Sequence, residues 1–295
     1  MIPRYPVYIP TKGRWRTPMT AKALAADGVP FRFVVEPQEA AAYEALFGAD
    51  HVLVLPFSNL GQGSIPARNW IKEHATDEGH ERHWQLDDNI RQFFRRYKGE
   101  RLPCHAGAAL AVTEDFVDRY ENVAIAGLGY DMFQPDGLPI PPFYLNTHVY
   151  SCTLVLNSTP HRWRGRYNED TDMCLQVLTD GWCTVQMNIF SAKKIATMRM
   201  KGGNTDELYR DDGRANMSRS LERRWPHVVE TKRRWGRPAH VVRDAWKRFD
   251  TPLRRKPGFD PEKVDGSKYA MKVVELEPVR SEALRKLIEG YDGGP

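Results

Sequence analysis

The sequence contains no long apolar run and few cysteines, and each absence excludes a class of protein. No apolar run in the 295 residues approaches the roughly 20 residues that a membrane-spanning helix needs. The first residues lack the basic-then-apolar layout of a secretory signal. Four cysteines without a C-x-x-C pair support neither a disulfide framework nor a structural zinc site. We therefore expect a soluble cytoplasmic protein with reduced thiols and no membrane partner.

The common nucleotide-binding signatures are also missing. A glycine-rich stretch, Asn59–Ser64, runs into an expected helix and has the form of a phosphate cradle. It lacks the Lys-Ser/Thr pair of a P-loop, and no G-x-G-x-x-G motif follows an expected strand. ATPase and dinucleotide-binding functions are therefore disfavoured.

Charge is distributed unevenly along the chain, which the formal net charge of +5 conceals. Residues 191–256 hold 19 Lys and Arg against 8 Asp and Glu, whereas the other residues hold 24 basic and 30 acidic side chains. Such asymmetry indicates a polyanionic partner, although a solvated helical face would give the same composition.

Short apolar runs that alternate with helix-compatible segments predict an α/β fold in the first 90 residues. Expected strands cover residues 6–10, 31–35, 51–55 and 83–86, and expected helices cover 19–27, 43–47 and 66–75. Strands that alternate with helices form a parallel sheet with helices on both faces. Ligands bind such sheets at the carboxyl ends of the strands, so the loops 11–14, 58–64 and 87–89 should converge there with Glu36.

The second half is less regular and ends in the basic segment. We expect helices over 108–120 and 171–179, and strands over 122–126, 151–156 and 184–190. These patterns predict a core over residues 1–192, a basic and mainly helical region over 193–256, and a linker with a short tail over 257–295.

Two acidic motifs contain candidate metal-binding or catalytic side chains. Asp87, Asp88 and Asn89 follow an apolar strand, and their oxygens suit a hard cation such as Mg²⁺ or Mn²⁺, although Asp and Asn also favour turns at strand exits. Glu169 and Asp170 precede a helix, where acidic residues stabilise the first turn. One of these carboxylates could instead serve as a general base.

Taken together, the motifs resemble those of GT-A glycosyltransferases, and in particular the TET-associated glycosyltransferases of bacteriophages and their relatives. The resemblance covers roughly residues 5 to 250. It is carried, in chain order, by Tyr8–Arg14, Val35–Pro37, Gly61, Ala67–Trp70, Trp84–Asn89, Glu169–Asp170, Lys201–Thr205 and Leu208–Tyr209.

The resemblance implies a GT-A-type, Rossmann-like, mainly parallel mixed sheet flanked by helices. It also implies transfer of a sugar from a UDP-sugar to the hydroxyl of 5-hydroxymethylcytosine in double-stranded DNA, in the cytoplasm of an infected bacterium, with Mn²⁺ or Mg²⁺. Asp170, with Glu169 beside it, corresponds to the catalytic base, and Asp87, Asp88 and Asn89 correspond to the metal motif, with Asn in place of its last Asp. The residues implied at the donor are Pro10, Thr11, Lys12, Arg14, Glu36, Gly61, Arg68 and Asp87.

In the basic segment, cations alternate with aromatic residues, a pattern typical of nucleic-acid binding. The alternative is that the tryptophans are core residues and the arginines a solvated face. The candidate DNA-binding residues are Lys201, Asn204, Arg214, Arg233, Arg234, Trp235 and Arg237.

Two other functions fit parts of the sequence. A glycosyltransferase or nucleotidyltransferase that acts on a glycan or small molecule would have the same α/β pattern in its first 90 residues. Such an enzyme would not explain the basic segment. A non-enzymatic DNA-binding protein would explain the basic segment, with the acidic motifs as turns and helix starts. The identity of the sugar, inversion or retention at the anomeric carbon, and the oligomeric state stay open.

Overall fold

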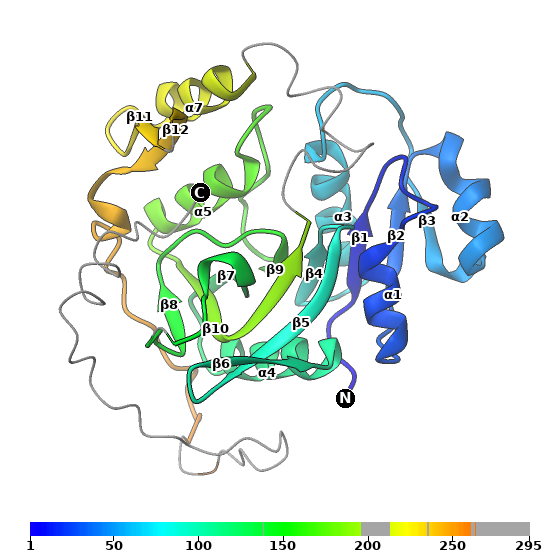
Figure 1. Cartoon of the computed structure of the whole chain (residues 1–295), viewed down its shortest axis with the longest axis horizontal. Coiled ribbons are helices and arrows are strands. Elements are labelled where there is room, and N and C mark those ends of the chain that lie inside the picture. Colours follow the sequence, from blue (N-terminus) through cyan, green and yellow to red (C-terminus); the bar gives the residue numbers. More distant parts are fainter. Residues whose placement is uncertain (138, 196–212, 235, 261–262, 264–295) are drawn as a thin grey trace.

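The computed structural model describes residues 1–137, 139–195, 213–234, 236–260 and 263. A ten-stranded mixed sheet forms its centre, with helices on both faces (Figure 1). The strands are β1 (Val7–Pro10), β2 (Arg32–Val35), β3 (Val52–Val54), β4 (Arg82–Leu86), β5 (Ile90–Tyr97), β6 (Glu100–Cys104), β7 (Val123–Tyr130), β8 (Phe143–Leu145), β9 (Cys152–Leu156) and β10 (Cys183–Lys194). The helices around it are α1 (Met19–Ala26), α2 (Ala40–Phe47), α3 (Ile65–Asp77), α4 (Ala106–Val117) and α5 (Glu169–Thr179).

The sheet order is β3-β2-β1-β4-β9-β7-β10-β5-β6, and β8 pairs with β10. Strands β3, β2, β1 and β4 are parallel, as the alternating strands and helices of the first 90 residues predicted. Strand β9 is antiparallel to both β4 and β7, and β10 is parallel to β7. The mixed α/β architecture of a Rossmann-like GT-A fold is therefore confirmed.

Each face of the sheet buries its own apolar side chains. On β1, Val7 and Ile9 pack into the main core with α1, α2 and α4, whereas Tyr8 points to the other face and packs against α3. Alternate burial on the two faces follows from the period of two along a strand. Helix α5 covers the same sheet through a third apolar cluster that contains Met173 and Val177.

One edge of the sheet collects the ends of four central strands. Because β4, β7 and β10 run in the same direction, their carboxyl ends lie together, and the residues that precede the antiparallel β9 lie there too. This edge brings Asp87, Tyr130, Ser151 and Lys194 into one neighbourhood. The expected convergence of loops at the carboxyl ends of the strands is observed, with β9 and β10 as additional contributors.

The hairpin β5–β6 was not expected from the sequence. Its turn is Lys98-Gly99, and both residues have positive φ, 49° and 84°. A two-residue hairpin turn of this kind favours Asn-Gly or Asp-Gly, so Lys-Gly gives a weak signal. Strand β5 nonetheless pairs with β10 on its other side and lies inside the sheet.

The basic region is less helical than expected. After α7 (Gly213–Arg224), β11 (Val229–Arg234) and β12 (Arg237–Val242) pair as an antiparallel hairpin, and a short 3-10 turn, η4 (Arg243–Trp246), follows. Val229 begins β11, Val242 ends β12, and the two residues are paired in the hairpin. Leu221, Val229 and Val242 pack against α5, so the described part of this region is docked on the core.

The expected boundary between residues 192 and 193 lies inside strand β10. Most of the expected tail, 257–295, falls outside the described residues. Among the described residues, no helix is both long and apolar enough to span a membrane.

Candidate active site

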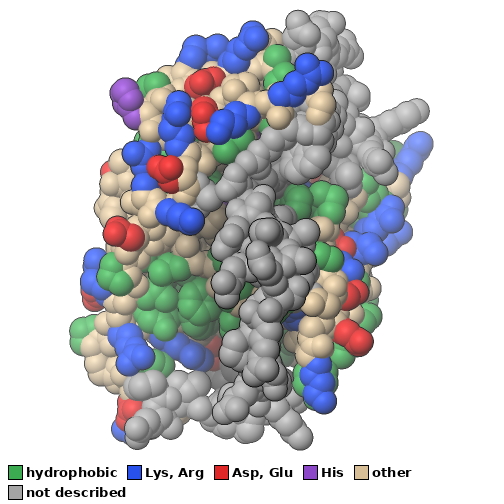
Figure 2. All heavy atoms as spheres, turned by 60° about the vertical axis from the view of Figure 1, so that its left-hand side comes forward, with side chains coloured by type: hydrophobic (Ala, Val, Ile, Leu, Met, Phe, Trp, Pro, Cys, Tyr) green, Lys and Arg blue, Asp and Glu red, His purple; other side chains and the backbone are tan. Residues whose placement is uncertain are grey.

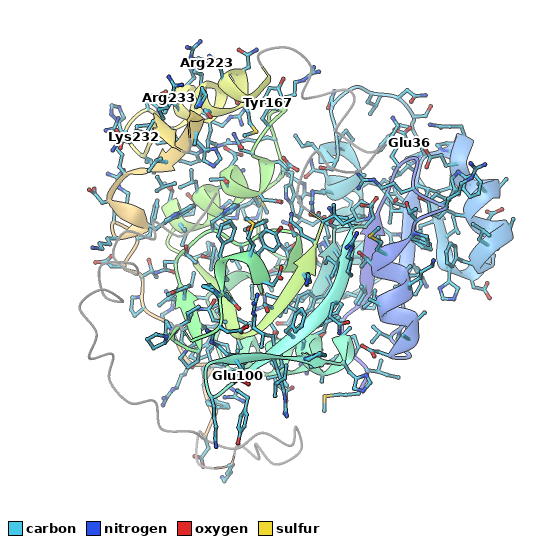
Figure 3. The ribbon with its side chains drawn as sticks, viewed as in Figure 1. Glu36, Glu100, Tyr167, Arg223, Lys232 and Arg233 are labelled. Atoms are coloured by element: carbon cyan, nitrogen blue, oxygen red, sulfur yellow. The ribbon has the colours of Figure 1, made fainter. Side chains whose placement is uncertain are left out.

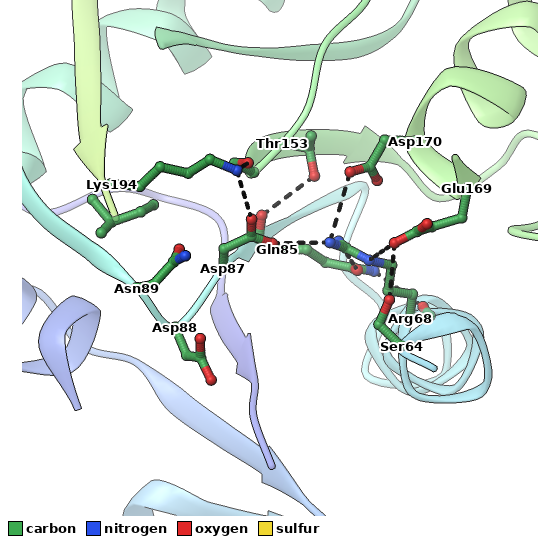
Figure 4. A network of polar contacts seen from close by, with 12 residues as sticks. Ser64, Arg68, Gln85, Asp87, Asp88, Asn89, Thr153, Glu169, Asp170 and Lys194 are labelled. Atoms are coloured by element: carbon green, nitrogen blue, oxygen red, sulfur yellow. Dashed lines mark hydrogen bonds and ion pairs between the residues drawn. The ribbon is translucent and has the colours of Figure 1, made fainter. Parts of the chain in front are cut away.

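Asp87, the first residue after β4, is held between two cations. Arg68 of α3 donates through Nη2 to Oδ1 of Asp87 at 3.0 Å, and the Lys194 ammonium lies 3.4 Å from Oδ2 (Figure 4). Burial alone would raise the pKa of Asp87, but Lys194 and Arg68 together hold it below its ordinary value. Asp87 is therefore an ionised carboxylate with a cation on each oxygen.

Arg68 is the buried centre of a polar network whose carboxylates are partly exposed. Only 4% of its side chain is exposed, and Nη1 donates to Oε1 of Gln85 at 3.2 Å. Besides Asp87, it lies 4.0 Å from Glu169 and 3.9 Å from Asp170. Burial would lower the pKa of Arg68, but the three carboxylates raise it instead, so the guanidinium stays charged. Arg68 thus orients the acidic side chains around it.

The first turn of α5 supplies two carboxylates with different surroundings. Glu169 accepts a hydrogen bond from the Ser64 hydroxyl at 3.0 Å, which joins the glycine-rich stretch before α3 to α5. Asp170 lies 3.9 Å from the Arg68 guanidinium, which is longer than the hydrogen bond of Glu169 to Ser64. Asp170 is therefore held less tightly by its neighbours than Glu169.

Burial raises the pKa of Asp170 to about 7. Arg68 lowers this value, whereas the neighbouring Glu169 and Asp87 raise it by like-charge repulsion. A carboxylate with a pKa near neutrality can both accept and release a proton under physiological conditions. This is the property that a general base requires.

Asp88 belongs to a different network from Asp87. Its Oδ2 accepts a hydrogen bond from the Thr11 hydroxyl at 2.7 Å, and its other oxygen pairs with the Arg14 guanidinium. Thr11 also bonds the Tyr43 hydroxyl, at 2.9 Å. Burial raises the pKa of Asp88 despite Arg14. The loop after β1 is therefore tied to the end of β4 through this carboxylate.

A second part of the predicted donor edge surrounds Glu36. Lys12 lies 3.1 Å from this carboxylate, and the backbone amide of Asn59 donates to it at 3.1 Å. Pro10 ends β1 immediately before these residues, and Gly61 lies in the adjoining loop with a φ of 64° that favours glycine. The structure thus brings the predicted donor residues into two adjoining groups, one around Asp88 and Glu36 and one around Arg68.

The three residues predicted as metal ligands do not face one another. Asp87 and Asp88 point in different directions, toward separate sets of partners (Figure 4). Asn89 donates from Nδ2 to the carbonyl of Ile195 at 3.1 Å, while its buried Oδ1 has no hydrogen-bond partner among the described residues. Within the described part of the chain, no group of three His, Cys, Asp or Glu side chains is placed to hold a metal ion. The arrangement does not fit a cation shared by Asp87, Asp88 and Asn89, and the metal requirement stays a prediction.

The predicted DNA-binding residues are only partly described. Lys201, Asn204 and Trp235 lie outside the described residues, as do the side chains of Arg214, Arg234 and Arg237. Arg233 is exposed near the end of β11, and Figure 3 shows it beside Lys232 with Arg223 of α7 close by. Lys and Arg side chains are prominent over this part of the surface in Figure 2.

Trp225, at the end of α7, is a packing residue. Its indole Nε1 donates to Oδ1 of the fully buried Asp172 at 2.8 Å, and its ring packs on the α5 cluster. Arg164 and Arg224 pair with the same carboxylate. Asp172 therefore ties the basic region to α5, and Trp225 is partly buried against the α5 cluster, which favours the alternative of a packing tryptophan.

Lys194 and Ser151 were not found from the sequence. Ser151 precedes β9 with a φ of 66°, which is unusual for a residue other than glycine, and its hydroxyl accepts a hydrogen bond from Lys194. The sequence marks neither residue, since one is a lysine among 43 basic residues and the other a serine at a strand start. Their relevance follows from the sheet order alone.

The comparison with protein families identifies the chain. The model of the TET-Associated Glycosyltransferase family matches residues 5–203, well over half of the chain, and includes every described residue of the network around Arg68. No curated protein matches the chain. The chain belongs to the TET-associated glycosyltransferase family, and it is a glycosyltransferase.

Proposed function

We propose that this glycosyltransferase moves a sugar from a UDP-sugar to the hydroxyl of 5-hydroxymethylcytosine in double-stranded DNA. The observation that carries the proposal is the network in which the buried Arg68 holds the partly exposed carboxylates of Asp87, Glu169 and Asp170 at the carboxyl edge of the sheet, inside the segment that matches the family. The family description associates these enzymes with TET, which supports an acceptor in modified DNA.

Asp170 is the proposed general base. Its carboxylate is less engaged than that of Glu169, and its pKa of about 7 suits removal of a proton from a hydroxyl in the transition state. Glu169, bonded to Ser64, is proposed to fix the start of α5 and so to orient Asp170. Arg68 acts through these carboxylates and is a positioning residue.

The donor's nucleoside is proposed to bind at the groups around Asp88 and Glu36. Thr11, Lys12 and Arg14 already hold these carboxylates at the ends of β1 and β4. Ligands of open α/β sheets bind outside the carboxyl ends of the strands, where these side chains lie. No step of the proposed reaction is assigned to the Mn²⁺ or Mg²⁺ that the resemblance implies.

The DNA is proposed to bind over α7 and the β11–β12 hairpin. Arg219, Arg223, Lys232 and Arg233 are exposed there, and Arg243 is exposed at the start of η4. Cations of this kind neutralise phosphates. Because Asp172 and Trp225 fix this region to α5, a duplex on it would lie on the same side of the chain as Asp170.

A product analysis tests the proposed function. The protein is incubated with hydroxymethylated DNA and a panel of nucleotide sugars, the DNA is digested to nucleosides, and the nucleosides are measured by mass spectrometry. We expect one hexose mass added to hydroxymethylcytosine with a UDP-sugar, and no addition in unmodified DNA or with Asp170→Asn.

Other outcomes would identify a different function. Donor hydrolysis without any sugar on DNA, together with no DNA binding at low salt, would favour a glycan or small-molecule acceptor. Tight DNA binding with neither donor binding nor donor hydrolysis would contradict the assignment of the network around Arg68 as an active site.

A further inference from the structure

Lys194 is placed at the active edge of the sheet by the end of β10. This strand pairs with β5, and the pairing shifts register between Lys193 and Lys194. A bulge of this kind redirects the side chain that follows it. Asn89 then fixes the neighbouring Ile195 from both sides: its backbone carbonyl accepts from the Ile195 amide at 3.2 Å, and its side chain donates to the Ile195 carbonyl at 3.1 Å. The residue predicted to bind metal thus helps to hold Lys194 in position.

The Lys194 ammonium is surrounded by groups that stabilise a cation. It lies 5.0 Å from the ring centroid of Tyr150 and 5.5 Å from that of Tyr130, in addition to its contacts with Asp87 and Ser151. Aromatic faces and a carboxylate both stabilise a cation. The site of this positive charge is therefore built from segments that are far apart in the sequence.

Of the two cations on Asp87, Lys194 is the one that can meet a ligand. Arg68 is held by Gln85 and three carboxylates, and 4% of its side chain is exposed. The side chain of Lys194 is 9% exposed, and its ammonium lies 3.4 Å from Asp87, compared with 3.0 Å for the Arg68 guanidinium. The ammonium is also at the end of a flexible four-carbon chain. A small movement of the ammonium away from Asp87 would place it on an incoming anion while Arg68 keeps Asp87 in place.

We propose that Lys194, rather than a divalent ion held by Asp87, Asp88 and Asn89, supplies the positive charge that binds the donor's diphosphate and stabilises it as it leaves. Each oxygen of Asp87 contacts a cationic side chain, and Asp88 contacts Thr11 and Arg14. The carboxylates of the expected metal motif are therefore already paired with side chains of the protein. This proposal rests on the UDP-sugar donor of the proposed function.

The transfer requires no reactant besides the UDP-sugar and the acceptor hydroxyl. The bond between the anomeric carbon and the β-phosphate oxygen breaks, and its electron pair goes to the departing UDP. The acceptor oxygen forms the new bond to the anomeric carbon, and its proton goes to Asp170. Lys194 transfers no proton, because its role is to offset the charge that develops on the diphosphate.

Calorimetric titration with UDP, uridine and inorganic pyrophosphate in EDTA tests the proposal. We expect wild type to bind UDP in EDTA, Lys194→Met to weaken UDP and pyrophosphate binding by about tenfold or more, and Lys194→Arg to restore most of it. Uridine, which lacks the diphosphate, should bind both proteins equally. Lys98→Met is the control, because Lys98 is exposed at the β5–β6 turn with its ammonium over the ring of Tyr97. Circular dichroism establishes that each variant is folded.

The outcomes separate this proposal from the proposed function. If wild type binds UDP only after Mn²⁺ or Mg²⁺ is added, and Lys194→Met binds it equally well, the role of Lys194 is wrong while the UDP-sugar donor stands. Equal weakening of uridine and UDP by Lys194→Met would also overturn it, since the weakening would then come from distortion of the nucleoside site. Wild type that binds neither UDP nor uridine under any condition would refute the donor, and the role of Lys194 with it.

Discussion

The carboxylates of Asp87 and Asp88, which are adjacent in the chain, belong to two separate polar networks. Asp87 joins α3 and β10 through Arg68 and Lys194, whereas Asp88 joins the loop after β1 through Thr11 and Arg14. Asp87 directly follows β4 and Asp88 begins the turn that leads to β5, and the two side chains point in different directions from this turn. The active edge consequently has two parts, and substitutions in each should have different kinetic effects.

Asp87→Asn and Asp88→Asn should separate these two parts. We expect Asp87→Asn to lower kcat by about a hundredfold, because Arg68 and Lys194 lose the charge that orients them. Asp88→Asn should instead raise the donor KM by about tenfold, because it disturbs Thr11 and Arg14 at the proposed nucleoside site. Steady-state kinetics with varied donor measure both. An unchanged donor KM with a large loss of kcat in Asp88→Asn would contradict this division.

The transfer rate should depend on the protonation of Asp170. Since burial raises its pKa to about 7, the base is protonated and inactive below that pH, and kcat/KM should rise between about pH 5.5 and 8 with a midpoint near 7. Asp170→Asn should lower transfer by at least about a hundredfold and leave donor binding intact. A profile already flat from about pH 5 upward would mean that a group with an ordinary carboxyl pKa is the base.

Asp170 should also make the fold less stable as the pH rises. Its pKa in the folded chain is above the ordinary value, so between about pH 4 and 7 the folded state binds more protons than the unfolded state, and stability falls with increasing pH. Asp170→Asn removes this dependence, so its stability relative to wild type should be greater at about pH 8 than at about pH 5. Urea unfolding at both pH values measures the difference. A variant whose relative stability is the same at both would show that Asp170 titrates normally.

Asp172 should be a stability residue rather than a catalytic one. It is fully buried and accepts from Trp225 and Arg164, while Arg224 pairs with it. Asp172→Ala should cost about 2–3 kcal/mol of unfolding free energy, since it leaves the indole N–H and both guanidiniums without this partner. The partly exposed arginines can be solvated, which limits the loss. Urea titration gives the value, and a loss below about 0.5 kcal/mol would show that the basic region docks without Asp172.

DNA binding should depend on salt through the exposed arginines of α7 and β11. Removing Arg219, Arg223 and Arg233 together should weaken binding and reduce the slope of log K against log salt by about 0.9 for each phosphate that is no longer neutralised. The control removes the same charge elsewhere, with Lys22, Arg95 and Lys98 changed to Ala. Fluorescence anisotropy over a salt series measures the slopes. Equal effects of the two triple variants would point to general electrostatic attraction instead of a defined surface.

Local patterns were sufficient to predict much of the fold. Short apolar and β-branched runs at residues 7–9 and 33–35 predicted strands, and Gly28 and Gly48 end helices where the backbone takes positive φ. The hairpin β5–β6 was not predicted, because Lys98-Gly99 is a weaker sequence signal for a two-residue turn than Asn-Gly or Asp-Gly. In the basic region, β11 and β12 were missed because a high density of arginine suggested a solvated helix, whereas the valines of the hairpin pack on α5.

By itself, the sequence determined the α/β class, the family resemblance and the neighbourhood of Asp87 and Asp170, because these depend on short-range periodicity and on motifs at strand ends. Only the tertiary structure decided which side chains meet there. Lys194 reaches Asp87 across 107 residues of sequence, through the order of β4, β9, β7 and β10 and a register shift at the end of β10. The same long-range pairing separates Asp87 from Asp88, because the partners that each carboxylate finds come from different strands and loops.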